Sequence, residues 1–167
     1  KGNSYQSACI IIDHALLSVP IFNDYLATLQ CDVKIIECDI SEPTYAKLEE
    51  KRSEIKNQKI DVFIGIGGGS AIDMAKGLAV LYSNHESAIN YRGFDKFDEP
   101  IPPIIAIPTT AGTGSEITPN ASFIDTDEKR KMGINGEKIR PKYAILDPEL
   151  TLSCPKAPTV SAGIDSM

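Results

Sequence analysis

The sequence DVFIGIGGGS spans residues 61–70 and runs directly into AIDMAK at residues 71–76. Residues 62–66 form a short apolar run rich in β-branched side chains, which is typical of a strand buried on both faces. Glycines end this run, and small or apolar side chains then recur at helical spacing as far as Tyr82. A strand, a glycine turn and a helix in this order can hold a phosphate. Glycine lets the backbone approach the ligand closely, and the amides at the start of the helix point at it.

The glycine turn does not identify a ligand by itself. Ser70 stands where the dinucleotide fingerprint G-x-G-x-x-G requires glycine, and no Gly-Lys-Ser/Thr follows as in a Walker loop. Ser70 could cap the following helix or donate a hydrogen bond to a phosphate oxygen. A tight turn without a ligand therefore stays an alternative until other parts of the chain are considered.

Composition sets the broad class of the protein. The chain has 167 residues, of which 42% are hydrophobic and 24% charged, as in an ordinary single globular domain. A net charge of −6 argues against nucleic acid or an anionic membrane as a partner, and no apolar run has membrane-spanning length. The four cysteines form no C-x-x-C pair, so we expect free thiols and a cytoplasmic location.

Strands and helices alternate over the first two thirds of the sequence. Strands are expected at residues 8–12, 33–38, 62–66 and 101–107, and helices after Pro20, after Thr44 and over residues 71–82. Residues 83–100 are polar and predict a loop that can include a short turn of helix. A β-hairpin over residues 121–134, a short strand at 143–146 and a helical segment from Pro155 follow. This alternation predicts an α/β fold with a doubly wound, mostly parallel sheet and a small β-hairpin.

Ligands of open α/β sheets bind at the carboxyl ends of the strands. Three such ends carry suggestive residues: Asp13, the loop 67–70 and the segment 108–116. An acid at a strand end can accept hydrogen bonds from a ribose and repel a 2′-phosphate, although it can equally cap a loop. The threonine-rich segment offers hydroxyls and close-approach glycines to a diphosphate or a ribose, although it can equally be a simple turn.

Several motifs along the chain closely resemble those of the iron-containing (group III) alcohol dehydrogenases. They are GGGS at 67–70 with Asp73 and Lys76, IPTTAGTGSE at 107–116, PKYAILDPELT at 141–151 and AGID at 162–165. The resemblance implies a Rossmann-like, dehydroquinate-synthase-like N-terminal domain. It also implies an oxidoreductase that transfers a hydride between a small alcohol or aldehyde and NAD(P), with a divalent metal polarising the alcohol oxygen.

The resemblance assigns roles to individual residues. Asp13 matches the acid beside the adenosine ribose, and Asp165 matches the first ligand of an Asp/His/His/His metal set for Fe²⁺ or Zn²⁺. The remaining matches contact the pyrophosphate or complete the cofactor pocket: Gly68, Gly69, Ser70, Thr109, Thr110, Thr113, Asn120 and Lys131. Neither His14 nor His85 lies in a ligand motif, so both are expected to be ordinary loop residues.

The chain departs from the family pattern in two ways. The family commonly has Asn-Pro-Thr after its second strand, where this chain has Glu42-Pro43-Thr44, and glutamate cannot donate the hydrogen bond of an amide.

The chain also begins without methionine and stops inside a ligand motif, so we expect a fragment. Residues 1–154 would be the NAD(P)-binding domain, and residues 155–167 would start an all-helical metal and substrate domain absent from this chain. Such a fragment alone is expected to be inactive.

Two other functions stay open at this point. A dehydroquinate-synthase-like lyase shares the fold, but its cofactor loop differs from GTGSE at residues 112–116. A non-catalytic nucleotide-binding module would follow if the native chain ended near Met167. Because Asp13 closes a strand with no basic residue beside it, we expect NAD to be preferred, with NADP possible. A homodimer or larger assembly is expected of the complete protein.

Overall fold

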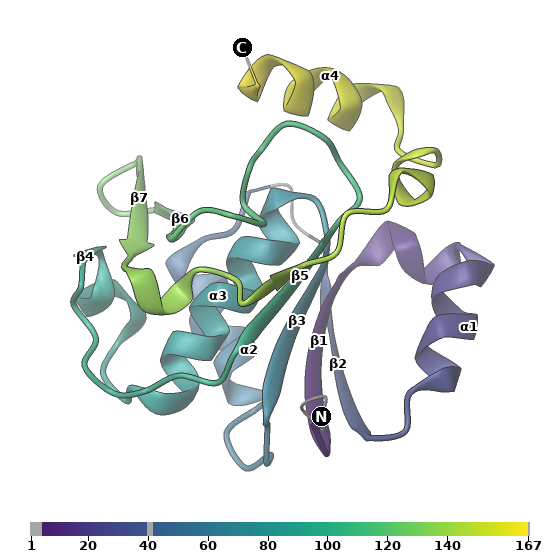
Figure 1. The fold of residues 1–167 in the computed structure, drawn as a ribbon. Coiled ribbons are helices and arrows are strands. Elements are labelled where there is room, and N and C mark those ends of the chain that lie inside the picture. Colours follow the sequence, from purple (N-terminus) through teal and green to yellow (C-terminus); the bar gives the residue numbers. More distant parts are fainter. Residues whose placement is uncertain (1–4, 40–41, 167) are drawn as a thin grey trace.

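A five-stranded parallel sheet forms the centre of the computed structural model, which describes residues 5–39 and 42–166 (Figure 1). Its strands, in spatial order, are β2 (Asp32–Cys38), β1 (Ser7–Asp13), β3 (Val62–Gly67), β5 (Ile104–Pro108) and β8 (Tyr143–Ala144). Every neighbouring pair is parallel, and Ile12 lies opposite Ile66 in the register of β1 and β3. The order of the strands reverses direction between β1 and β3. Their carboxyl ends therefore form the crevice where open α/β sheets bind ligands.

Helices cover both faces of this sheet, which confirms the predicted fold class. α1 (Pro20–Thr28) lies on one face, and α2 (Tyr45–Ser53) and α3 (Gly69–Ser83) lie on the other (Figure 1). α4 (Lys156–Asp165) lies over the carboxyl ends of the strands. The short 3₁₀ helices are η1 (His14–Ser18), η2 (Ala88–Tyr91), η3 (Glu137–Ile139) and η4 (Pro148–Thr151).

Two apolar clusters hold these layers together. The larger one includes Phe63, Leu48 and Leu78 and fills the space between the sheet and the helices α2 and α3. The smaller one includes Ile10 and Phe22 on the α1 side. α3 packs most tightly of all, because its residues 71–81 are all buried. This rigid central helix carries the glycine turn at its first residues.

The predicted hairpin is present and belongs to a second, three-stranded sheet. β6 (Asn120–Asp125) and β7 (Arg130–Asn135) pair antiparallel, and β4 (Gly93–Phe94) pairs with β7 in parallel. The strand β4 lies in the segment for which a loop was predicted. Its two residues are too few to show any hydrophobic alternation.

Other element boundaries differ from prediction for local reasons. β5 begins at Ile104 rather than residue 101, because Pro102 and Pro103 have no N–H group to donate to a strand ladder. β8 has only two residues, although the Ile145 N–H still donates to the Ala106 carbonyl at 2.9 Å. Among the residues that the structure describes, no helix combines the length and apolar character needed to cross a bilayer.

Candidate cofactor site

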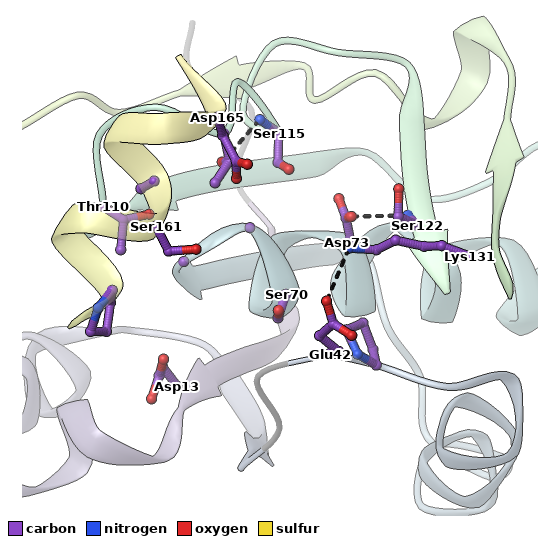
Figure 2. Close-up of a pocket in the computed structure, with 16 residues that line it drawn as sticks. Asp13, Glu42, Ser70, Asp73, Thr110, Ser115, Ser122, Lys131, Ser161 and Asp165 are labelled. Atoms are coloured by element: carbon purple, nitrogen blue, oxygen red, sulfur yellow. Dashed lines mark hydrogen bonds and ion pairs between the residues drawn. The ribbon is translucent and has the colours of Figure 1, made fainter. Parts of the chain in front are cut away.

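A cleft of about 330 Å³ lies at the carboxyl ends of the strands, beneath α4 (Figure 2). It brings together residues that are far apart in the sequence, from the ends of β1 and β3 to the hairpin and α4. Most of the predicted site residues line it: Asp13, Gly68, Gly69, Ser70, Thr110, Thr113, Lys131 and Asp165. The sequence motifs thus converge on one place in the fold.

The glycine turn forms one wall of this cleft. Gly67 has a φ of 145° and leaves no room for a side chain, since a Cβ there would lie 2.9 Å from the Cβ atoms of both Ala71 and Asp13. Gly68 is different, because its backbone is extended and a Cβ would meet only Thr110, at 3.5 Å. Gly68 is the N-cap residue of α3, so Ser70 lies within the first turn and does not take the capping position. The first amides of a helix lack intrahelical partners and can bind an anion.

The threonine-rich loop forms the facing wall. The Thr109 N–H donates to the Gly67 carbonyl at 2.9 Å, which ties this loop to the glycine turn. The Thr110 Oγ1 atom is buried and has no hydrogen-bond partner among the described residues. A Cβ on Gly112 would lie 1.8 Å from the Ala162 carbonyl oxygen, so glycine is required for α4 to approach the loop. The unpaired hydroxyl opposite the glycine turn is consistent with a ligand that brings its own polar groups.

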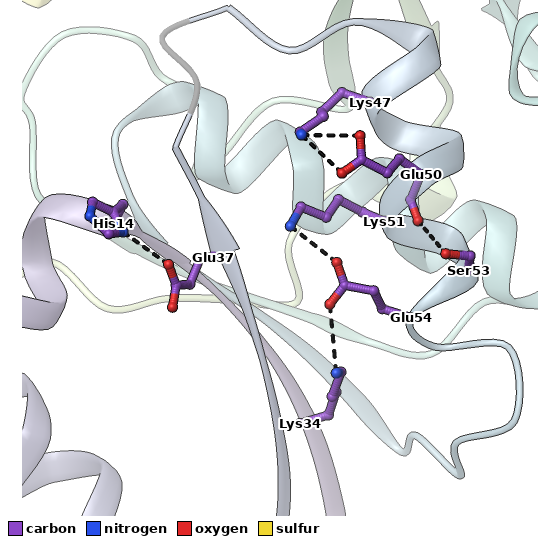
Figure 3. A network of polar contacts seen from close by, with 8 residues as sticks. All are labelled: His14, Lys34, Glu37, Lys47, Glu50, Lys51, Ser53 and Glu54. Atoms are coloured by element: carbon purple, nitrogen blue, oxygen red, sulfur yellow. Dashed lines mark hydrogen bonds and ion pairs between the residues drawn. The ribbon is translucent and has the colours of Figure 1, made fainter.

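Asp13 closes the end of the cleft formed by β1. Its Oδ1 atom accepts a hydrogen bond from the Ala15 N–H at 3.0 Å, so the carboxylate caps η1. Loop capping was the alternative to ribose binding, but a carboxylate has capacity for both. Beside it, the exposed His14 lies 2.9 Å from Glu37 on the neighbouring strand (Figure 3).

The opposite end of the cleft is formed by α3 and the hairpin. The Asp73 carboxylate accepts a hydrogen bond from the Ser122 N–H at 2.9 Å (Figure 2). Lys76 is completely buried beneath it, with its Nζ atom 3.7 Å from Asp73 Oδ1. Lys131 of β7 lies 3.6 Å from Glu42, which precedes α2. Asp73, Glu42 and Ser122 were not among the predicted site residues, although Asp73 and Lys76 belong to the motif that follows the glycines.

Burial shifts the pKa values of the buried pair. Removal from water raises the pKa of Asp73, against the opposing effects of Lys76 and the Ser122 N–H. Burial lowers the pKa of Lys76 to about 8, although Asp73 acts in the other direction. Both pKa shifts follow from burial, because water solvates the charged forms of Asp73 and Lys76 poorly at these positions.

Two predicted site residues lie outside this cleft. Thr109 is buried and lines a smaller adjoining cavity of about 240 Å³, which also contacts Asp13 and Thr110. Asn120 is exposed at the start of β6, and its carbonyl oxygen accepts a hydrogen bond from Lys76 Nζ at 2.6 Å. Direct contact of these two residues with a cofactor stays a prediction.

The metal prediction rests on a single residue. Asp165 lines the cleft from α4, close to Ser161 and Ala162 of the same helix. Within residues 5–39 and 42–166, no group of three or more histidine, cysteine, aspartate or glutamate side chains is arranged to hold a metal ion. Metal binding by Asp165 therefore stays a prediction.

Comparison with known proteins assigns the family. Residues 1–148 match the family described as iron-containing alcohol dehydrogenase. The chain belongs to this family. It is 33% identical to the NAD-dependent methanol dehydrogenase of Bacillus methanolicus over 97% of its own length and 43% of that protein. It is 39% identical to the sulfoacetaldehyde reductase of Bilophila wadsworthia over 75% of its own length and 32% of that protein.

Solved structures of family members superimpose closely on the chain. An alcohol dehydrogenase from Oenococcus oeni matches with a TM-score of 0.88 at 28% identity, over 97% of this chain and 44% of that one. A sulfoacetaldehyde reductase from Bifidobacterium kashiwanohense in complex with NAD⁺ matches with a TM-score of 0.87 at 28% identity, over 96% and 43%. The chain thus spans less than half the length of these relatives, and the family resemblance seen in its motifs is confirmed.

Proposed function

We propose that this chain is the cofactor-binding part of a metal-dependent, NAD-linked alcohol dehydrogenase. The enzyme would transfer a hydride from the carbinol carbon of a small alcohol to the nicotinamide ring, with loss of the hydroxyl proton, or run in reverse from an aldehyde. The observation that carries the proposal is the glycine turn facing the unpaired Thr110 hydroxyl at the crevice between β1 and β3. NAD-linked relatives and one relative solved with NAD⁺ support it.

Each part of the cleft has a role in this proposal. The amides that follow Gly68 would bind the diphosphate, and Asp13 would accept hydrogen bonds from the adenosine ribose. Lys131 would reach the nicotinamide half of the cofactor from the hairpin. These roles require a long ligand that lies across the strand ends. Asp13 and Lys131 line opposite ends of the cleft and would contact opposite ends of this ligand (Figure 2).

Asp165 would hold the metal together with ligands from the rest of the protein. Iron or zinc bound there would act as a Lewis acid on the alcohol oxygen. A carboxylate oxygen suits either ion, and α4 places this one over the cleft. We also propose a cytoplasmic enzyme that forms a homodimer or a larger assembly. Family membership favours the dehydrogenase over the lyase alternative.

The proposal is tested by replacing Gly68 with valine in the intact protein. The Gly68 backbone is extended, and a Cβ there would lie 3.5 Å from its nearest neighbour, Thr110. The variant should therefore fold. Its side chain would project toward Thr110 and occupy the space of the diphosphate. We expect NAD⁺ affinity to fall at least tenfold, or about 1.4 kcal/mol, in a calorimetric titration.

Gly163→Val is the matched control, because no atom of the described part of the chain lies within 4 Å of a Cβ at that position. It adds the same side chain on α4 and should leave NAD⁺ affinity unchanged. Undiminished affinity in a correctly folded Gly68→Val protein would exclude the glycine turn as the diphosphate site.

A further inference from the structure

Two charged residues of α3, Asp73 and Lys76, are buried in the first two turns after the glycine turn. Lys76 has no exposed surface, and Asp73 is only 8% exposed. Burying two charges costs free energy that their mutual attraction recovers only with good geometry and further hydrogen bonds. Here the two groups are 3.7 Å apart, and each is bound to the same neighbouring segment, residues 118–122.

That segment leads into the first strand of the hairpin. Lys76 Nζ donates to the Thr118 carbonyl at 3.0 Å and to the Asn120 carbonyl at 2.6 Å. Asp73 accepts from the Ser122 N–H at 2.9 Å. Side chains of α3 thus bind the backbone at residues 118, 120 and 122, which are every second residue of the segment leading into β6. These contacts fix where β6 begins and how it lies against α3.

The position of β6 decides where Lys131 lies. In the hairpin register Ile124 pairs with Lys131, and Ser122 pairs with Gly133. Lys131 is half-exposed, and among the described residues its amine is anchored only by an ion pair with Glu42 at 3.6 Å. A solvent-exposed pair of this kind contributes little to holding its partners in place. The backbone of the hairpin, and not this ion pair, must therefore set the position of the Lys131 amine at the cleft.

We propose that Lys76 is a positioning residue, which together with the Asp73–Ser122 hydrogen bond fixes residues 118–122 to α3 and so places Lys131 at the nicotinamide end of the cleft. The inference rests on the proposed function, because it assumes that a dinucleotide lies in the cleft with its adenosine end at Asp13. It assigns a binding role to Lys76, whose side chain holds the protein backbone instead of the ligand, whereas Asp73 also lines the cleft.

The test compares two ligands on the intact protein. ADP spans only the adenosine end and the diphosphate, whereas NAD⁺ also reaches the nicotinamide end. Lys76→Met keeps the aliphatic stem and removes the donors to Thr118 and Asn120. We expect the dissociation constant for NAD⁺ to rise about fivefold to tenfold, while that for ADP stays within about twofold. Lys76→Leu, which also lacks the donors to Thr118 and Asn120, should show the same pattern if Lys76→Met folds poorly.

A double-variant cycle separates positioning from general destabilisation. If Lys76 acts through Lys131, Lys131→Ala should weaken NAD⁺ binding, and adding Lys76→Met to it should cause almost no further loss. Leu81→Ala is the control, because Leu81 is buried farther along α3 and lines a different cavity. It should lower thermal stability without changing the ratio of the two affinities.

The outcomes distinguish this inference from the proposed function. If the wild-type protein binds neither NAD⁺ nor ADP, the proposed function fails. If it binds both and Lys76→Met weakens both equally or neither, the inference fails and the proposed function stands. Additive losses in the double variant, or no loss in Lys131→Ala, would likewise overturn the inference.

Discussion

Single residues in this cleft can combine a structural task with the ligand-binding task that we propose for them. Asp13 caps η1 through one oxygen, and the same side chain lines the cleft where the adenosine ribose of a dinucleotide would lie. His14 follows Asp13 in the sequence, and its ring contacts Glu37 on the neighbouring strand (Figure 3). A 2′-phosphate placed beside Asp13 would therefore meet negative charge, which favours NAD over NADP.

Replacing Asp13 with asparagine tests this preference. Asparagine keeps an oxygen that can accept from the Ala15 N–H, so η1 stays capped while the charge is lost. We expect the ratio of kcat/KM for NAD⁺ to that for NADP⁺ to fall by about tenfold or more, since a like-charge repulsion of one or more kcal/mol is removed. Steady-state kinetics with both cofactors measure the ratio, and His14→Gln should leave it unchanged. A wild-type enzyme that already prefers NADP⁺ would contradict the interpretation.

Among the elements, α3 does most to organise the site. It presents the glycine turn at its first residues and binds the hairpin through Asp73 and Lys76 one turn later. The sequence was sufficient to predict the strand, the turn and the helix, because each follows from local periodicity and glycine placement. It was not sufficient to predict that Lys76 is buried. A Lys three residues after an Asp is typical of an exposed helical ion pair, and the covering segment lies more than 40 residues further along the chain.

The same limit applies to Ser122, which sequence analysis missed, and to Glu42, which it noted only as a departure from the family pattern. Glu42 lies shortly before α2 and Ser122 lies in β6, yet both line the same cleft. No local pattern records this arrangement. The predicted strand at residues 101–107 failed at its start for a local reason that the sequence did contain, namely the two prolines.

Buried Lys76 should leave a signature in the pH dependence of stability. Its pKa is lowered to about 8 by burial, with Asp73 and Glu116 opposing the shift and Arg140 adding to it. Above pH 8 the folded protein releases a proton that the unfolded chain keeps until about pH 10.5. The unfolded state then binds more protons, so this group makes the folded state more stable as the pH rises, by up to about 1.4 kcal/mol per pH unit.

Urea denaturation of the wild type and of Lys76→Met at pH 7 and pH 9.5 measures this effect. We expect the stability of the wild type relative to the variant to increase between the two pH values. The comparison removes contributions from groups that titrate alike in both proteins. Parallel changes in the two proteins would show that the Lys76 amine has an ordinary pKa.

For the whole molecule, the important feature is that α4 crosses over the mouth of the cleft. The chain leaves the sheet after β8, passes through η4 and returns over the strand ends (Figure 1). The absence of a side chain at Gly112 lets the helix backbone lie directly on the threonine-rich loop. Asp165 and the glycine turn thus line one cleft from separate elements. We therefore expect that the proposed cofactor and metal sites can be disrupted independently.

Asp165→Ala tests that independence in the intact protein. Without the carboxylate, we expect bound metal and alcohol turnover to be lost together, because one ligand of the metal set is removed. NAD⁺ affinity should stay within about twofold of the wild type, since the diphosphate amides belong to α3 and not to α4. Elemental analysis, a turnover assay and a NAD⁺ titration on the same sample measure the three quantities.

Ser166→Ala, one residue further on, controls for disturbance of the helix end. A variant with full metal content and normal turnover would rule out Asp165 as a ligand and leave it as an ordinary acid at the end of α4.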